Sequence, residues 1–153
     1  MNSYMQMAKE EADKGSKAGE GGPFGAVIVD ETGNIIAKAH NTVILHHDPT
    51  EHAEINAIRQ AAKYRKSEDL SGCALYTSCE PCPMCLSAII WSNIKEVYYA
   101  CTKEDAGEIG FRDDMIYEFI KGNQQEILNL KSIDREECIK IMKQYKELGG
   151  VIY

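Results

Sequence analysis

The sequence predicts an α/β fold in which helices cover both faces of a central β-sheet. Two patterns carry this prediction. A β-hairpin pattern occupies residues 26–41, and a strand–helix–strand pattern occupies residues 73–101. The second pattern implies parallel strands, and a sheet that contains them needs cover on both faces. A length of 153 residues leaves room for one domain, so we expect a single domain over residues 1–153.

The N-terminal part of this fold is expected to be one helix followed by the hairpin. Apolar residues recur at helical spacing over Ser3–Ala18, which predicts an amphipathic helix. A glycine-rich loop follows, and then two β-branched, apolar segments, Ala26–Asp30 and Ile35–Asn41. The turn between them contains Gly33, so the two segments are predicted to be antiparallel strands.

The middle of the chain is expected to supply the parallel strands. A helix is predicted from Pro49 to about Lys66, with Thr50 as its candidate N-cap. Cys73–Thr77 is predicted to be a buried strand, and Met84–Asn93 a helix. Glu96–Cys101 is then predicted to be the strand that completes the strand–helix–strand unit.

The last third of the chain has a weaker pattern. Helices are predicted over Asp114–Lys121 and Asp134–Leu148, with a short strand over Glu126–Leu130 between them. Counting that segment, we expect a mixed sheet of about five strands.

Composition and charge exclude several classes of protein. The net charge of −7 repels long nucleic acids and suits a small neutral substrate better. No apolar run approaches the about 20 residues that cross a bilayer, and the N-terminus has no apolar segment typical of a secretory signal. Six cysteines in a chain without an export signal are expected to be thiols or metal ligands in the cytoplasm.

The segment Pro81–Cys85 has the pattern P-C-x-x-C and stands where a strand is predicted to end and a helix to begin. Pro83 suits the first helical turn, so both sulfurs would lie at a helix N-terminus. The helix dipole and the unpaired backbone N–H groups there favour the thiolate. A thiolate pair can bind zinc or exchange disulfides, and the motif alone leaves both open.

His52 is the candidate that favours zinc. In the middle of a helix it would be an ordinary surface histidine, but at the predicted start of a helix it can face a second helix terminus. One histidine and two cysteines make three ligands, the number typical of catalytic zinc. A structural site needs a fourth ligand, and the remaining histidines are expected to be exposed: His40, His46 and His47.

H-x-E followed by P-C-x-x-C is typical of zinc-dependent nucleobase deaminases, and both parts are present in this chain. The chemistry agrees with the pattern. Zinc lowers the pKa of a bound water toward neutrality and so supplies hydroxide as the nucleophile. Glu54 is two residues from a ligand, which suits a carboxyl group that carries protons to the ring and to the departing amine.

A longer resemblance supports this interpretation. It covers residues 22–29, Asp48-Pro-Thr-Glu-His-Ala-Glu54, residues 75–86 around the cysteines, and residues 106–117 around Gly110-Phe111. On these segments the chain resembles the cytidine deaminase superfamily, and within it the branch that acts on guanine. The resemblance implies a three-layer α/β/α sandwich of the cytidine deaminase type. It also implies hydrolysis of guanine to xanthine and ammonia.

The resemblance also implies roles for individual residues. His52, Cys82 and Cys85 would bind zinc, and Glu54 would be the proton shuttle. Guanine presents donors at N1 and at its exocyclic amine, so a carboxylate can accept from both, whereas adenine has an acceptor at N1. The substrate-binding residues implied by the resemblance are Phe24, Asn41, Ala53, Asp113 and Tyr153.

The resemblance further implies a homodimer in which a C-terminal segment, about residues 120–153, is swapped between subunits. Several alternatives stay open at this point. Within the class they are a tRNA adenosine deaminase and a cytosine or guanosine deaminase. Outside it the alternative is a binding module that zinc stabilises without catalysis.

Overall fold

A computed structural model describes residues Met1–Tyr153, which form two compact units, Met1–Asp114 and Met115–Tyr153. The first unit contains a mixed four-stranded sheet in the order β2-β1-β3-β4. Strand β1 pairs antiparallel with β2 and with β3, whereas β3 and β4 are parallel. The strands are β1 (Gly25–Val29), β2 (Ile35–His40), β3 (Ala74–Cys79) and β4 (Glu96–Cys101).

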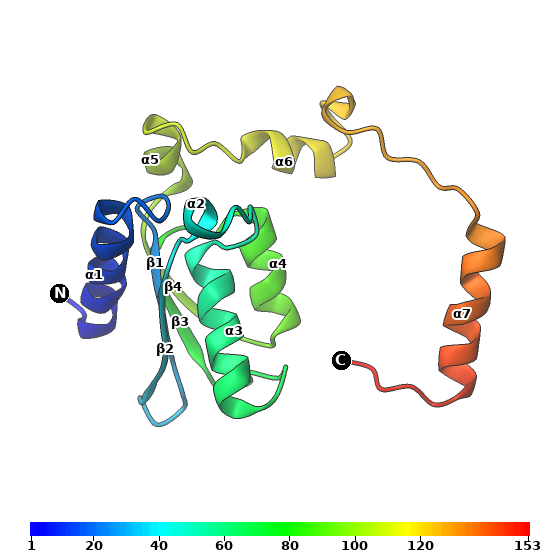
Figure 1. Ribbon diagram of the computed structural model, residues 1–153, viewed down its shortest axis with the longest axis horizontal. Helices are drawn as coiled ribbons and strands as arrows, with labels where there is room; N and C mark the ends of the chain where they lie inside the picture. The colour runs from blue at the N-terminus through cyan, green and yellow to red at the C-terminus, as the bar shows by residue number, and fades with distance from the viewer. The chain divides into compact units, whose positions relative to one another are not determined.

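Helices cover both faces of this sheet, which confirms the three-layer α/β/α prediction (Figure 1). Helix α1 (Ser3–Lys17) packs on one face, where Ala8 contacts Val27 and Val29. Helices α3 (Ala53–Arg65) and α4 (Pro83–Trp91) cover the other face. All five residues of β1 are buried because this strand lies between the two helical layers.

Helix α1 approaches β1 at Gly25. A Cβ atom on this residue would lie 2.0 Å from the carbonyl oxygen of Ala8 and 2.6 Å from the backbone nitrogen of Ala12. No side chain fits at those distances, so the absence of one at Gly25 allows the close contact between helix and sheet.

The prediction of about five strands was wrong by one strand. Within the second unit, η1 (Gln125–Ile127) is a single 3₁₀ turn inside the segment predicted as Glu126–Leu130. The rest of that unit's secondary structure is helical, with α6 (Asp114–Ile120) at its start and α7 (Arg135–Glu147) near its end. A strand needs a neighbour to accept its backbone hydrogen bonds, and this unit holds none.

Two short helices were not predicted, α2 (Val43–His46) and α5 (Lys103–Glu108). Helix α5 does have a sequence signal, since Thr102 and Asp105 form a reciprocal capping box at its start. The prediction that Thr50 is the N-cap of α3 was wrong. The N-cap residue is His52, and the helix begins at the next residue. None of the helices has the length and apolar character that spanning a membrane requires.

Candidate metal centre

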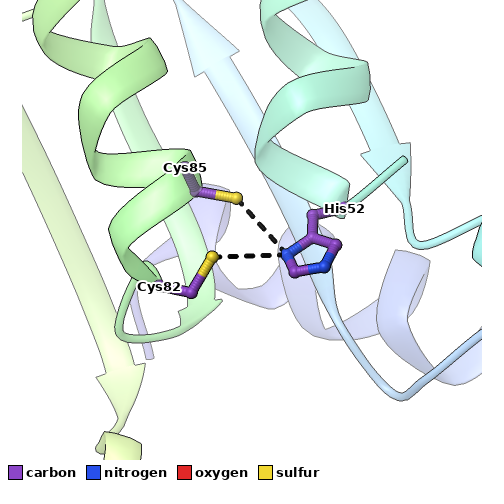
Figure 2. Close-up of side chains that lie close together, drawn as sticks. All are labelled: His52, Cys82 and Cys85. Carbon is purple, nitrogen blue, oxygen red and sulfur yellow. Dashed lines mark hydrogen bonds between the residues drawn. The ribbon is translucent and has the colours of Figure 1, made fainter. Parts of the chain in front are cut away.

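Two helix N-termini face each other across a cluster of histidine and cysteine side chains (Figure 2). His52 is the N-cap residue of α3, and Cys82 is the N-cap residue of α4. Pro83 occupies the first helical position, which places Cys85 one turn along the same helix. The predicted meeting of two helix starts is therefore present.

The spacing of the three side chains suits a tetrahedral zinc ion. The Nδ1 atom of His52 lies 3.5 Å from Cys82 Sγ and 3.5 Å from Cys85 Sγ. Zinc–sulfur and zinc–nitrogen bonds of about 2.3 and 2.1 Å at tetrahedral angles put such atoms about 3.6 Å apart. The donor atoms all lie within 4.8 Å of one another, so a zinc ion would need little rearrangement of the protein. Three ligands leave a fourth position for water or substrate.

The electrostatics of the cluster favour a thiolate. The pKa of Cys82 falls to about 4, because the Cys85 thiol hydrogen-bonds to it and His52 hydrogen-bonds to it as well. The same two hydrogen bonds raise the pKa values of the groups that make them, Cys85 and His52. The hydrogen bond with Cys82, followed by burial, raises the pKa of Cys85, and the bond to Cys82 raises the pKa of His52. The cluster therefore favours the thiolate form of Cys82, which is the form that binds a metal ion.

Glu54 lies beside this cluster and is only 6% exposed. Its Oε1 accepts a hydrogen bond of 2.9 Å from Thr77 Oγ1, and its Oε2 lies 3.4 Å from Cys85 Sγ. Burial raises the pKa of this carboxyl above its ordinary value. A raised pKa makes the carboxylate easier to protonate, which suits a group that accepts a proton and passes it on.

Thr77 is a site residue that the sequence reasoning missed. It is fully buried in β3, where alternate residues point into the core shared with α3 and α4. A signal was present, because a hydroxyl at a buried strand position needs a polar partner. Only the folded sheet shows that this partner is Glu54, which lies 23 residues earlier in the chain.

Asn41 lies at the end of β2 with its side chain buried and oriented. Its Oδ1 accepts a hydrogen bond from Val43 N at 3.0 Å, while its Nδ2 donates to no protein atom. A Cβ atom on Gly21 would lie 2.1 Å from that Oδ1, so the glycine-rich loop packs closely on the amide. A side-chain donor is left available for a ligand.

The other residues predicted to bind substrate differ in their surroundings. Phe24 is partly buried and meets Phe111 edge-on, with ring centroids 5.0 Å apart. Asp113 is half-buried; burial raises its pKa, and the Cys82 charge adds to that rise, so the carboxyl lies in the electrostatic field of the metal centre. Ala53 is fully buried at the start of α3. Tyr153 is 77% exposed in the second unit, and its role stays a prediction.

The remaining histidines do not join the cluster. His46 and His47 are exposed as predicted. The same prediction was wrong for His40, which is mostly buried between two carboxylates. Its Nδ1 lies 2.8 Å from Glu11 Oε2, and its Nε2 lies 2.5 Å from Glu20 Oε2. The packing of α1 against the end of β2 creates this arrangement, which no local pattern reveals.

Residues 1–101 match the family model described as the cytidine and deoxycytidylate deaminase zinc-binding region. The chain belongs to this deaminase family. Zinc is therefore the metal of this deaminase, as the motif predicted. The chain is 50% identical over 123 residues to the guanine deaminase of Bacillus subtilis, which covers 80% of this chain and 78% of that protein.

Solved structures of deaminases agree with the sequence comparison. The X-ray structure of the guanine deaminase from Bacillus subtilis superposes with a TM-score of 0.88 and 42% identity, covering 96% of this chain and 95% of that one. A tRNA-specific adenosine deaminase of Haemophilus influenzae is 38% identical over 134 residues, which is 88% of this chain and 76% of that protein. The likeness to the guanine enzyme is therefore the stronger of the two.

Proposed function

We propose that this protein is a guanine deaminase, a zinc-dependent hydrolase that converts guanine and water to xanthine and ammonia. The observation that carries the proposal is the cluster of His52, Cys82 and Cys85 with the buried carboxyl of Glu54 beside it. The likeness to the Bacillus subtilis guanine deaminase supports guanine as the substrate. When bound, zinc supplies the Lewis acidity that makes water a nucleophile near neutral pH.

Glu54 is the proton carrier in this proposal. Thr77 holds Oε1, so Oε2 is the oxygen on the side of the zinc ligands and of the reacting atoms. Oε2 takes the proton that water loses when it adds to C2 of guanine and delivers one to the ring nitrogen. The remaining proton of the added oxygen then goes to the exocyclic nitrogen, the bond from C2 to that nitrogen breaks as the C2 carbonyl forms, and ammonia leaves.

Asp113, Asn41 and Phe24 are proposed to select and hold the base. The Asp113 carboxylate accepts from N1–H and from the exocyclic amine, a pair of donors that adenine does not present. The unused Nδ2 of Asn41 donates to an acceptor on the purine. Phe24, held edge-on by Phe111, supplies an apolar face for the ring. We propose that Ala53 and Tyr153 complete the substrate site.

The first experiment is a substrate panel with the zinc-loaded protein and its Asp113→Asn variant. Ammonia release is measured with guanine, cytosine, adenine, guanosine and an adenosine-containing tRNA stem-loop, with chelator-treated protein as the control. We expect guanine alone to turn over, and Asp113→Asn to lower kcat/KM for guanine by about tenfold to a hundredfold without loss of zinc. Turnover of the tRNA substrate in preference to guanine would refute the proposal.

We also propose that the protein acts as a cytoplasmic homodimer, with a C-terminal segment of about residues 120–153 exchanged between subunits around one deaminase domain. All six cysteines are free thiols, which suits a reducing compartment. Within the first unit, Ile90 and Trp91 at the end of α4 are 67% and 70% exposed, as a subunit contact requires.

Light scattering tests the dimer. Wild-type protein is expected at twice the chain mass of 17.1 kDa, and Trp91→Glu is expected to shift the equilibrium toward the monomer. A matched control is Tyr64→Glu, an exposed aromatic on α3. A monomeric wild type at working concentration would refute the assembly but not the deaminase chemistry.

A further inference from the structure

Two cysteines outside the metal centre lie side by side at the carboxyl ends of β3 and β4. Cys79 and Cys101 are Cα partners in the parallel strand pair, and both are free thiols. Neighbouring strands lie about 4.8 Å apart, which is inside the range of about 4.4 to 6.8 Å between Cα atoms that a disulfide spans. Paired residues of adjacent strands also project from the same face of the sheet. The backbone therefore allows these two thiols to join.

The two thiols differ in their access to solvent. Cys101 is exposed, whereas Cys79 is buried with its sulfur 3.5 Å from the carbonyl oxygen of Thr102. That oxygen belongs to the residue that follows Cys101, so the Cys79 sulfur lies beside the end of β4. Both cysteines also line a cavity of about 520 Å³ between α1 and α5, which is ample for a small oxidant. An oxidant can therefore reach Cys101 from solvent, and the paired residue on the neighbouring strand is a second cysteine.

The difference in burial between the two thiols sets the order of reaction. Burial, followed by the neighbouring Cys101 charge, raises the pKa of Cys79 to about 12. Cys79 therefore remains a protonated thiol, while the exposed Cys101 is the thiol that reacts first with the oxidant. This division into a reacting and a resolving cysteine is the arrangement that redox-sensitive pairs use.

We propose that Cys79 and Cys101 form a site of reversible oxidation by hydroperoxides. The Cys101 sulfur attacks the peroxide, breaks its O–O bond and becomes a sulfenic acid, while the peroxide leaves as an alcohol or as water. The Cys79 sulfur then displaces hydroxide from that sulfenic acid, and water leaves with the Cys79 proton. One peroxide thus oxidises two thiols to one disulfide.

The oxidation site is linked to the metal centre through Thr77. The Thr77 hydroxyl lies 2.9 Å from Glu54 Oε1 and 3.1 Å from the carbonyl oxygen of Cys79. The Thr77 hydroxyl proton is therefore shared between two acceptors. A disulfide that moves the Cys79 backbone would change the hydrogen bond from Thr77 to Glu54. This consequence, unlike the disulfide itself, rests on the proposed function.

Peptide mapping without reduction tests the site in the zinc-loaded, full-length protein. After treatment with hydrogen peroxide, we expect a linked pair of peptides that contain Cys79 and Cys101, about 2 Da lighter than the two thiol peptides together. In Cys79→Ser, a sulfenic-acid probe is expected to label Cys101 instead. Cys138→Ser is the matched control, because Cys138 is exposed in the second unit and its loss should leave the linked pair unchanged.

Three results would overturn the proposal. These are oxidation confined to Cys82 and Cys85 with release of zinc, disulfides between Cys101 residues of two chains, and sulfenic acid that persists on Cys101 of the wild type.

Turnover of guanine is measured in a separate experiment. It is expected to fall several-fold on oxidation and to recover with dithiothreitol in the wild type, but to stay constant in Cys101→Ser. A protein that forms the linked pair but never deaminates guanine would refute the proposed function and leave the oxidation site standing.

Discussion

At the scale of single residues, Glu54 has a separate partner for each carboxylate oxygen. Thr77 holds Oε1 from β3, and the Cys85 sulfur faces Oε2 from α4. These two contacts keep the carboxyl group from rotating, and Oε2 stays directed to the metal centre. Preorganisation of this kind reduces the cost of orienting a group at the moment of reaction.

Replacing Glu54 with glutamine keeps its size and removes its ability to carry protons. We expect kcat for guanine to fall by about a hundredfold to ten-thousandfold, with zinc content and thermal unfolding close to wild type. Metal analysis and circular dichroism accompany the kinetics. Undiminished activity in Glu54→Gln would remove this residue from the mechanism, and inactive wild-type protein that binds zinc would favour a non-catalytic binding module.

Replacing Thr77 with valine tests the hydrogen bond that orients the carboxyl. Valine has nearly the same shape, so the expected loss is mainly that of the bond to Glu54, about 1.5 to 3 kcal/mol for a bond to a charged group. We expect kcat to fall about tenfold to a hundredfold with KM little changed, and the pH profile of kcat to shift. Thr77→Ser retains the hydroxyl and should restore most of kcat; equal loss in both variants would indicate a packing role alone.

At the scale of elements, the contact between α1 and β1 depends on Gly25. The variant Gly25→Ala puts a methyl group within 2.0 Å of the Ala8 carbonyl oxygen, so helix and strand must separate. We expect the free energy of unfolding to fall by about 1 to 3 kcal/mol, measured by urea denaturation. Gly107→Ala in α5 is the control, because no atom lies within 4 Å of its added methyl group. A stability equal to wild type in Gly25→Ala would contradict the close contact.

A second junction between elements, formed by Glu11 of α1, Glu20 of the loop and His40 of β2, makes stability depend on pH. Burial lowers the pKa of His40, but the hydrogen bonds to the two carboxylates outweigh it and the net pKa is raised. A raised folded-state pKa stabilises the protein below the unfolded value of about 6.5, and this contribution disappears as pH rises through the folded value.

Variant His40→Gln is therefore expected to be less stable than wild type by about 1 to 3 kcal/mol near pH 6. This difference in the free energy of unfolding should shrink as the pH rises above 7. Wild type then loses the interaction of protonated His40 with its two carboxylates, whereas glutamine carries no charge at any pH. Urea unfolding at several pH values measures it. A difference that stays constant from pH 6 to 9 would show that His40 contributes no charge to this junction.

At the scale of the whole molecule, zinc held by His52, Cys82 and Cys85 would connect α3 to α4 and so contribute to stability as well as chemistry. A metal that binds only the folded chain stabilises it by about 2.7 kcal/mol at a free concentration of a hundred times Kd. Chelator-treated protein is expected to unfold about 5 to 10 °C below the zinc-loaded form, with recovery when zinc is added back. Calorimetry measures the shift, and identical transitions for the two forms would contradict zinc binding at this centre.

The sequence by itself predicted most elements of the first unit and zinc as the metal of this family. Helical spacing, β-branched segments and glycine turns are local signals, and they predicted the hairpin, the strand–helix–strand unit and α1 to within a few residues. The motif residues His52, Cys82 and Cys85 each lie at a helix start, and a helix start is also readable from neighbouring residues.

Only the tertiary structure decided which distant groups meet. Thr77 and Glu54 are 23 residues apart, and His40 lies 29 residues from Glu11, so no periodicity reports either contact. The segment 126–130 had the composition of a strand but no neighbouring strand to pair with in its unit, and it formed a 3₁₀ turn instead. Hydrogen bonds and burial between elements depend on packing, whereas helix starts and turns depend on adjacent residues, and this difference separates what the sequence predicted from what it missed.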